Sequence, residues 1–327
     1  MNHPILFRIA AFLAAALSLG LAQAQENPAK NFPDKPIHVI VGYAPGGAND
    51  IVARIMGQQL SEAVGQAVVI ENKVGAAGSI AASYAARANP DGYTLLFAPS
   101  SIFATNPVMF KKLPYASSDF VPISMVATFP LILVVGANQP FQSAKDLVEY
   151  LKLNPKKANF SGAAGVHQLA FGLFKNQTGT TGEYIAYKGT NLSVAAVMTG
   201  EVLMSMADAA GVSPQLKGGQ VRGLAVTSRE RLPSFPNIPT VAEAGFPGLE
   251  MGSWMGLLAP AGTPLPIVRK LQQEVNRIVK TASFKERMNA LEVTPEASTS
   301  EEFGSLINSD LARWRAVAKA SNIEATD

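Results

Sequence analysis

The chain has 327 residues, with 27 lysines and arginines against 24 aspartates and glutamates, and no cysteine. This length suits about two domains with their own cores, and the lack of cysteine excludes disulfides, thiol nucleophiles and cysteine-ligated metal centres. The formal net charge is only +3 and like charges form no long run, so nucleic-acid binding is poorly supported. An apolar fraction of 48% is that of a folded protein.

The first 24 residues have the pattern of a secretory signal. Arg8 precedes the apolar stretch from Ile9 to Leu21, and Ala22-Gln23-Ala24 has the small-x-small form of a cleavage site. The apolar stretch is shorter than the ~20 residues that span a bilayer. We therefore expect a soluble exported product whose mature chain begins near Gln25.

Apolar runs alternate with helical patterns through the first part of the mature chain. We expect strands at 38–41, 67–71 and 93–98 and helices at 51–64 and 79–88. Such strand–helix alternation predicts an α/β fold with a mostly parallel sheet and helices on both of its faces.

A second series of the same kind follows. It predicts strands at 131–135, 159–160, 183–187, 202–206 and 223–227, and helices at 143–153, from His167 onward and up to Thr199. Two longer helices end the chain, at 265–280 and 301–321. Ser143-x-x-Asp146 and Thr299-x-x-Glu302 are capping-box patterns that mark two of these helix starts.

Two segments between the series, 118–128 and 249–258, read as extended chain and indicate two crossings between domains. If the chain leaves the first domain near Ala127 and returns near Gly252, its C-terminal helices belong to the first domain. The expected division is therefore a signal at 1–24, a discontinuous first domain at 25–126 plus 253–327, and a second domain at 127–252.

Glycine- and serine-rich loops follow four of the expected strands, at 42–50, 75–79, 99–101 and 161–167. Glycines let backbone N–H groups face a ligand, and a helix N-terminus adds partial positive charge. Open α/β sheets bind ligands at the carboxyl ends of their strands, where all four loops are expected. Because the G-x-G-x-x-G and G-x-x-x-x-G-K-[ST] motifs are absent, the pattern favours a small anion over a nucleotide.

Catalytic signatures are missing. The chain contains neither G-x-S-x-G nor H-E-x-x-H, and its expected mature part has only two histidines, His38 and His167. The carboxylates show no metal-binding spacing, so we expect no enzyme activity, no metal and no cofactor.

Ordered motifs along essentially the whole mature chain resemble one known family. They are Ala44-Pro45-Gly46-Gly47-x-x-Asp50, Val69-x-Glu71-Asn72-Lys73-x-Gly75-Ala76-x-Gly78, Pro90-Asp91-Gly92-Tyr93-Thr94-Leu95-Leu96, Tyr187-Lys188-Gly189, Arg231-Leu232-Pro233, Ile238-Pro239-Thr240-Val241-Ala242-Glu243-Ala244-Gly245 and Gly256-Leu257-Leu258-Ala259-Pro260-Ala261-Gly262-Thr263-Pro264. This set is similar to the Bug family, the periplasmic solute-binding receptors of tripartite tricarboxylate transporters.

The resemblance implies a two-lobed periplasmic binding protein of type II-like architecture. Each lobe would be a mostly parallel sheet flanked by helices, and two crossing strands would join the lobes. The family holds a small carboxylated solute between the lobes, largely through backbone N–H groups and water. It further implies the membrane subunits of such a transporter as partners, a monomeric receptor, and neither nucleic acid nor cofactor.

One departure bears on the ligand. After Tyr187-Lys188-Gly189 the family usually continues x-Pro-Ala, whereas this chain has Thr190-Asn191-Leu192. The departure leaves the expected fold intact and affects the identity of the ligand, for which an aliphatic diacid, an aromatic acid and an amino acid all remain open.

The candidate ligand-binding residues lie on these loops. They are Tyr43, Gly47, Ala48, Asn49, Asp50, Ala76, Ser100 and Ser101 in the first domain, and Ser161, Ala164, Gly165, His167, Thr190 and Asp208 in the second. Structural alternatives exist for several of them. The carboxylate of Asp50 suits a helix start, the serines suit turns or caps, and His167 and Asp208 are equally suited to holding loops together.

Two other functions remain open on the sequence alone. An exported hydrolase would need Ser100, Ser101 or Ser161 as a nucleophile near His167. A sensor that presents its ligand to a membrane kinase would use the same closed conformation as a transport receptor.

Overall fold

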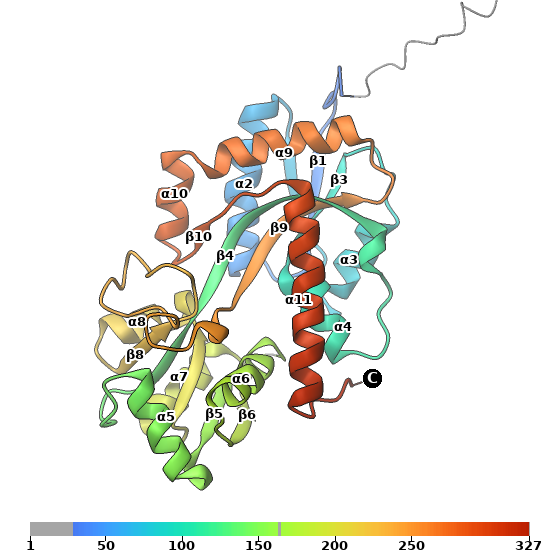
Figure 1. The fold of residues 1–327 in the computed structure, drawn as a ribbon. Coiled ribbons are helices and arrows are strands. Elements are labelled where there is room, and N and C mark those ends of the chain that lie inside the picture. The colour runs from blue at the N-terminus through green and yellow to red at the C-terminus, as the bar shows by residue number, and fades with distance from the viewer. Residues whose placement is uncertain (1–28, 163–164, 327) are drawn as a thin grey trace, which may run out of the picture.

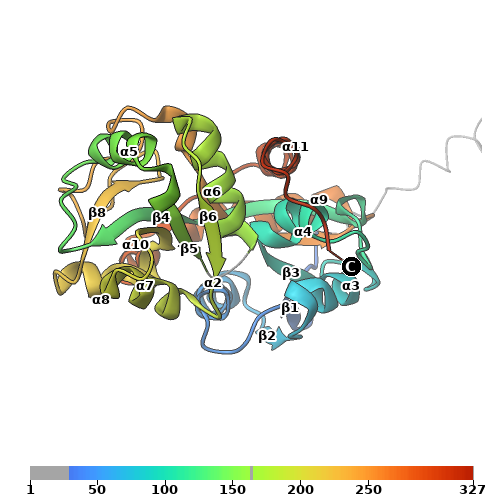
Figure 2. The ribbon, with the colours of Figure 1, turned by 90° about the horizontal axis from the view of Figure 1, so that it is seen from below.

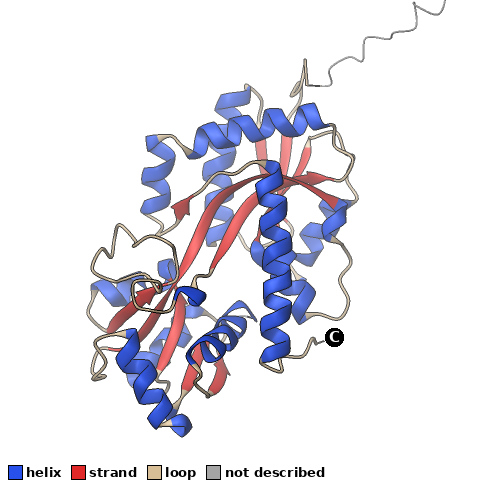
Figure 3. Ribbon diagram, viewed as in Figure 1, coloured by secondary structure: helices blue, strands red, loops and turns tan. Residues whose placement is uncertain are grey.

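The computed structural model describes residues 29–162 and 165–326, so the expected signal at 1–24 lies outside the described residues. Two lobes of sheet and helix are joined by long strands, which run between them in Figure 1 and stand out in red in Figure 3. The strands follow the order β2-β1-β3-β9-β4-β7-β5-β6, and β8 and β10 pair with β4 off this path. The fold is the α/β, two-lobed architecture that the sequence predicts.

Lobe one is built on three parallel strands that lie close to the expected ranges. These are β1 (Ile37–Val41), β2 (Val68–Asn72) and β3 (Thr94–Pro99), with helices α2 (Ala48–Val64) and α3 (Ser79–Ala86) between them. β1 pairs with β2 on one side and with β3 on the other. Gly65 ends α2 at φ +71°, in the left-handed region that glycine adopts without steric cost.

Lobe two repeats the pattern around β5. Its elements are β5 (Asn159–Gly162), β6 (Glu183–Ala186), β7 (Met204–Asp208), β8 (Val221–Val226), α5 (Ala144–Leu153), α6 (Gly165–Thr178), α7 (Thr190–Thr199) and α8 (Ala209–Lys217). β5 runs parallel to both β6 and β7. The expected capping box forms at the start of α5, where Ser143 and Asp146 bond each other's backbone.

The crossings are two antiparallel strands. β4 (Phe120–Gly136) is one strand of 17 residues, where the sequence predicts an extended segment and a separate strand. It pairs with β9 (Gly252–Pro260) as far as Pro130 and with β7 and β8 from Leu131 onward. A single strand therefore belongs to the sheets of both lobes.

The C-terminal segment returns to lobe one. It consists of α9 (Leu265–Val279), α10 (Ala282–Asn289), β10 (Thr294–Pro295) and α11 (Ser300–Ala320). α9 packs beside α2, and α11 contacts β4, the short helix α4 (Asn106–Met109) and α6 of lobe two. Figures 1 and 2 show α11 beside the junction of the lobes.

Besides the four-residue α4, two helices were not predicted from the sequence. α8 contains Pro214, which disfavours a helix interior, and α10 begins directly after α9, where the Thr281 hydroxyl caps it by accepting from the Phe284 N–H. In both cases the local signal is weak and packing decides the structure.

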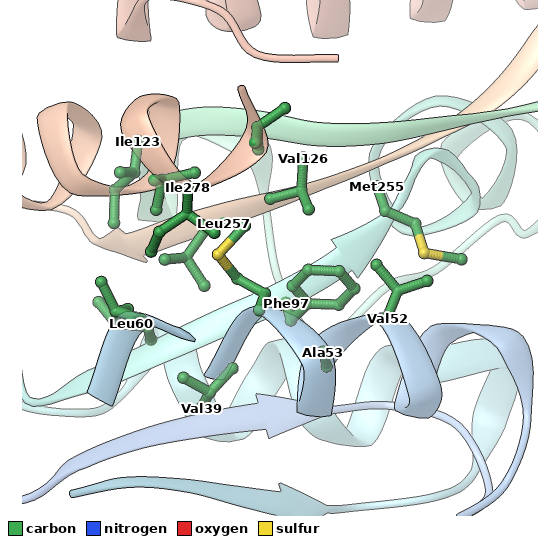
Figure 4. Close-up of a cluster of buried hydrophobic side chains, with 14 of the residues drawn as sticks. Val39, Val52, Ala53, Leu60, Phe97, Ile123, Val126, Met255, Leu257 and Ile278 are labelled. Atoms are coloured by element: carbon green, nitrogen blue, oxygen red, sulfur yellow. The ribbon is translucent and has the colours of Figure 1, made fainter. Parts of the chain in front are cut away.

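Each lobe has its own apolar core. In lobe one, Phe97 of β3 is fully buried among Val52 of α2 and Met255 and Leu257 of β9 (Figure 4). In lobe two, the rings of Phe160 and Phe171 stack with centroids 4.7 Å apart. Within the two described ranges, no helix combines the length and the apolar character needed to cross a bilayer.

Candidate functional site

The carboxyl ends of β3 and β7 approach the lobe junction from opposite sides. Ser100, directly after β3, bonds Ser253 of β9 at 2.8 Å between hydroxyl oxygens. Ser253 pairs with Phe129 of β4, and two residues further along β4, Leu131 pairs with Asp208, the last residue of β7. β9 and β4 lie between β3 and β7 in the strand order. Three spacings between neighbouring strands, each ~4.8 Å, therefore separate the ends of β3 and β7, roughly 15 Å in all. The expected loops of both lobes thus face one region.

Asp50 holds the first of these loops together. Its buried carboxylate accepts hydrogen bonds from the Gly46 N–H at 2.9 Å, Arg54 Nε at 2.9 Å and Asn72 Nδ2 at 2.8 Å. Asn72 also donates to the Tyr43 carbonyl. Burial opposes ionisation, yet these donors together lower the pKa of Asp50 to about 2. Because the Asp50 carboxylate already accepts these bonds within lobe one, they favour a structural role for Asp50 over contact with a ligand.

Tyr43, Ser101 and the turn that contains Ala76 and Ala77 come together from three loops. The Tyr43 hydroxyl lies 2.7 Å from Ser101 Oγ and 3.4 Å from the Ala77 carbonyl, and burial raises the pKa of Tyr43. Ala76 and Ala77 both have positive φ, at +46° and +51°, an uncommon conformation for residues other than glycine. Asn106 of α4 donates to the Ala77 carbonyl at 2.9 Å and fixes this turn. The structure therefore joins the ends of β1, β2 and β3 into one surface.

The helices that start at this region lack side-chain caps. α2, α3 and α7 begin after Gly47, Gly78 and Gly189, and no side chain bonds their first N–H groups. Elsewhere in the fold, Ser143, Thr281 and Thr299 cap helices through their hydroxyls, whereas α9 begins after Pro264 without a side-chain cap. Such helix starts leave donors and partial positive charge for an anion, although the first N–H of α3, that of Ser79, already donates to the Ala76 carbonyl.

Lobe two contributes a polar group formed by Thr190, His167 and Asp208. Thr190 Oγ1 donates to Asp208 Oδ2 at 3.0 Å, and His167 Nε2 lies 3.5 Å from the same oxygen without hydrogen-bond geometry. His167 is 3% exposed, and neither of its ring nitrogens has a hydrogen-bond partner. Desolvation opposes the charge on Asp208, but His167 and Thr190 outweigh it and lower the pKa of the carboxyl.

Gly165 brings α6 against lobe one. A Cβ added at Gly165 would lie 3.3 Å from Met109 Cγ and Cε at the end of α4. The start of α6, which carries His167, is therefore next to the segment that follows Ser101. Ala164 lies outside the described residues.

Two other candidates are placed differently. The Ser161 hydroxyl is fully buried and donates to the Ser193 carbonyl at 3.0 Å, so it is engaged inside lobe two. Asn49, in the first turn of α2 beside Ala48, has a buried Oδ1 without a hydrogen-bond partner.

Sequence reasoning missed four residues that shape the site: Asn72, Asn106, Ser253 and Met109. Asn72 is part of the Glu71-Asn72-Lys73 motif after the second strand, so its position held a usable signal. Ser253 and Met109 reach the site only through the antiparallel pairing of β9 and the docking of α6, which no local pattern reveals.

The surface has two depressions outside the candidate site. One, of about 520 Å³, is lined by residues such as Tyr84 and Arg87, and the other, of about 460 Å³, by residues such as Gln58 and Arg277. Neither contains a candidate site residue. Across the described ranges, no group of three or more histidine, aspartate and glutamate side chains is placed to hold a metal ion.

Comparisons with known proteins agree with this geometry. The family model described as "Tripartite tricarboxylate transporter family receptor" matches residues 52–323. Protein BugT of Bordetella pertussis is 32% identical over 89% of this chain and 90% of its own.

Solved structures extend the comparison. The structure "R. palustris Rpa4515 with adipate" is 32% identical, covers 90% of this chain and 100% of its own, and has a TM-score of 0.77. Periplasmic binding protein BugD is 31% identical with the same coverage and a TM-score of 0.72. MatC from Rhodopseudomonas palustris with bound malate is 29% identical, covers 88% and 99%, and has a TM-score of 0.71.

These matches extend over both lobes and both crossings. The family is one of binding proteins, and a solved member is periplasmic. The chain therefore belongs to the family of tripartite tricarboxylate transporter receptors, whose Bug members its sequence motifs resemble.

Proposed function

We propose that the mature chain is an exported receptor that captures a small carboxylated solute between its lobes. The observation that carries the proposal is the set of uncapped helix starts at α2, α3 and α7, on two lobes that face each other across the crossings. Backbone N–H groups at such starts bind a carboxylate without a charged side chain. Relatives of similar fold hold adipate and malate, both carboxylates.

The proposal assigns the ligand contacts to residues of both lobes. In lobe one they are Gly47, Ala48, Asn49, Ala76 and Tyr43 with Ser101; in lobe two they are Gly165, His167, Thr190 and Asp208. Asp50, Ser100 and Ser161 stabilise the loops that carry these contacts and do not contact the ligand themselves, because their side chains are already bonded within the protein. The lobes, divided as 25–126 plus 253–327 and 127–252, would close by bending at β4 and β9.

Export and delivery complete the proposal. The signal-like segment at 1–24 directs the chain to the periplasm, where the closed, liganded receptor docks on the membrane subunits of a tripartite tricarboxylate transporter. The receptor acts as a monomer and requires no cofactor.

The hydrolase alternative finds little support. In the described part of the chain, the three serines it requires bond to Ser253, Tyr43 and the Ser193 carbonyl, and none of them bonds His167. An activated nucleophile needs a base within hydrogen-bond reach, so binding without turnover fits the geometry better.

A binding measurement tests the proposal. The mature protein, from Gln25, is screened by thermal shift against carboxylic and amino acids, with native mass spectrometry to detect a co-purified ligand. A ligand at ~100 times its Kd adds about 2.7 kcal/mol to the unfolding free energy, which raises Tm by several degrees. If no acid raises Tm and no ligand is retained, the proposed function is wrong.

Uptake separates transport from sensing. A strain that lacks the gene should take up the identified solute more slowly than its parent, and reintroduction of the gene should restore the rate. Unchanged uptake would contradict the transport role and favour the sensor.

A further inference from the structure

The lobe-two half of the site contains a buried polar side chain without a hydrogen-bond partner among the described residues. His167 lies in the first turn of α6, is 3% exposed, and has no hydrogen-bond partner at Nδ1 or Nε2. A buried polar group without a hydrogen-bond partner destabilises the protein. Such groups in native proteins usually have a partner, and the nearest described one, the Asp208 carboxylate, lies 3.5 Å from Nε2 without hydrogen-bond geometry.

Asp208 stands beside this imidazole and faces outward. Its side chain is 38% exposed, whereas the neighbouring His167 side chain is 4% exposed. The Thr190 hydroxyl donates to Oδ2 and fixes the orientation of the carboxylate. Since an ionised carboxylate only accepts hydrogen bonds, whatever meets Asp208 in the site has to donate.

Lobe one also contains a buried hydrogen-bond acceptor without a partner. The buried Oδ1 of Asn49, in the first turn of α2, also has no partner. The donors of the site are thus the backbone N–H groups at the helix starts. Its acceptors are Asn49 Oδ1, which has no partner, and the Asp208 carboxylate, which accepts from Thr190 and is partly exposed. A ligand that offers only acceptor oxygens would pair with the donors and offer nothing to these acceptors.

We infer that the solute carries, besides the carboxylate held by the helix starts, a hydroxyl or ammonium group that donates to Asp208 and is positioned with the help of His167. The ligand class is therefore a hydroxy acid or an amino acid, and an unsubstituted aliphatic acid is disfavoured. This inference rests on the proposed function and narrows the ligand of the same site.

Sites built to pair a ligand's polar group strongly reject the analogue that lacks it, because their own buried groups are then left unpaired. The same reasoning places the ligand's carboxylate away from Asp208, since two carboxylates in contact repel each other. The Asp208 carboxylate is thus the residue that distinguishes substituted from unsubstituted acids.

The test uses sets of acids that differ at one carbon substituent. Succinate, malate and aspartate carry hydrogen, hydroxyl and ammonium at that carbon, and adipate and 2-aminoadipate extend the comparison to a longer chain. Propionate, lactate and alanine provide the same comparison with a single carboxylate. Affinities are measured by calorimetry on the full mature protein, on Asp208→Asn and on Glu183→Gln, an exposed control on lobe two.

We expect the wild type and Glu183→Gln to bind a substituted member of at least one set at least tenfold more tightly than its unsubstituted parent. Asp208→Asn should lose at least tenfold of that preference. Its unfolding transition, followed by tryptophan fluorescence, shows whether the variant is folded.

The outcomes separate the two proposals. Equal binding of parent and substituted acids, or a preference that survives Asp208→Asn, overturns this inference while leaving carboxylate capture intact. If no acid of any set binds the wild type but the wider screen finds another carboxylic acid, this inference fails and carboxylate capture stands. If no acid of the wider screen binds either, the proposed function fails with it.

Discussion

Glu292, in the connection between α10 and β10, accepts a hydrogen bond from Lys217 Nζ of α8 at 3.0 Å. Ser213 of the same helix donates to the same carboxylate oxygen, also at 3.0 Å. Glu292 is 7% exposed and has a left-handed φ of +55°, a conformation that persists only where surrounding contacts enforce it. This contact links the C-terminal segment of lobe one to a helix of lobe two, apart from the crossings.

Removing this carboxylate should weaken the protein measurably. Glu292→Ala leaves the buried Ser213 hydroxyl without its acceptor, and we expect a loss of about 1–3 kcal/mol in unfolding free energy. Lys217→Ala should cost less than about 1 kcal/mol, because the Lys217 side chain is 58% exposed and its ion pair is screened by water. Urea unfolding of both variants checks the order, and a larger loss for Lys217→Ala would contradict it.

Asp50 should make stability depend on pH in the acid range. Its pKa falls to about 2 in the folded protein from an ordinary value of 3.8, so its contribution is present above about pH 4 and is lost as the pH falls toward 2. At 1.36 kcal/mol per pKa unit the contribution is about 2 kcal/mol. Asp50→Asn should therefore be less stable than wild type at pH 7 and nearly equal at pH 2. A difference that stays constant between these values would contradict the prediction.

Gly46 and Gly78 form a matched pair for separating backbone strain from crowding. Both have positive φ, +80° and +86°, but a Cβ at Gly46 meets nothing within 4 Å, whereas one at Gly78 lies 2.9 Å from Ile102 Cδ1. Alanine should cost about 1 kcal/mol at Gly46 from conformation alone, and at least 1 kcal/mol more at Gly78 from overpacking. Thermal unfolding of Gly46→Ala and Gly78→Ala checks this, and equal losses would show that the Ile102 side chain moves aside freely.

Asp310 on α11 should act in the opposite pH direction to Asp50. Burial raises its pKa, although the Trp254 indole N–H donates to it at 2.8 Å. A raised carboxyl pKa means that stability is lost as the pH rises through the range above 3.8. Asp310→Asn keeps an acceptor for Trp254 without the charge, so at pH 7 it should be at least as stable as wild type, with its relative advantage shrinking below pH 4.

The control for this prediction is Asp310→Ala. It leaves the Trp254 N–H unpaired in a buried setting and should cost about 1–3 kcal/mol at every pH. Trp254 and Trp314 are the two tryptophans of the chain, so fluorescence follows unfolding directly. If Asp310→Asn and Asp310→Ala lose the same stability at pH 7, the charge on Asp310 is not the controlling factor.

The sequence predicts most of the local structure because local signals are strong there. The apolar runs of β1 and β3, the capping boxes at Ser143 and Thr299, and Gly65 each determine an element through nearby residues alone. α8 was not predicted because it contains Pro214, and α10 was not predicted because it begins so soon after the end of α9. In both helices tertiary packing decides the structure.

The site is predicted less completely than the fold. The loops follow the expected strands, since the carboxyl edge of a parallel sheet depends only on chain order. Which side chains remain free in them depends on long-range partners. Ser161 is occupied by Ser193, and Asp50 is occupied by Asn72 and Arg54, contacts that no spacing in the sequence reveals.

The continuity of β4 has a mechanical consequence. Because its first half belongs to the ladder with β9 and its second half to the ladders with β7 and β8, rotating one lobe against the other twists a strand that remains bonded at both ends. Closure of the lobes, which the proposed function requires, would change the twist of this strand from the value that the sheet sets. Opening would restore that twist, so the backbone would favour release of the solute.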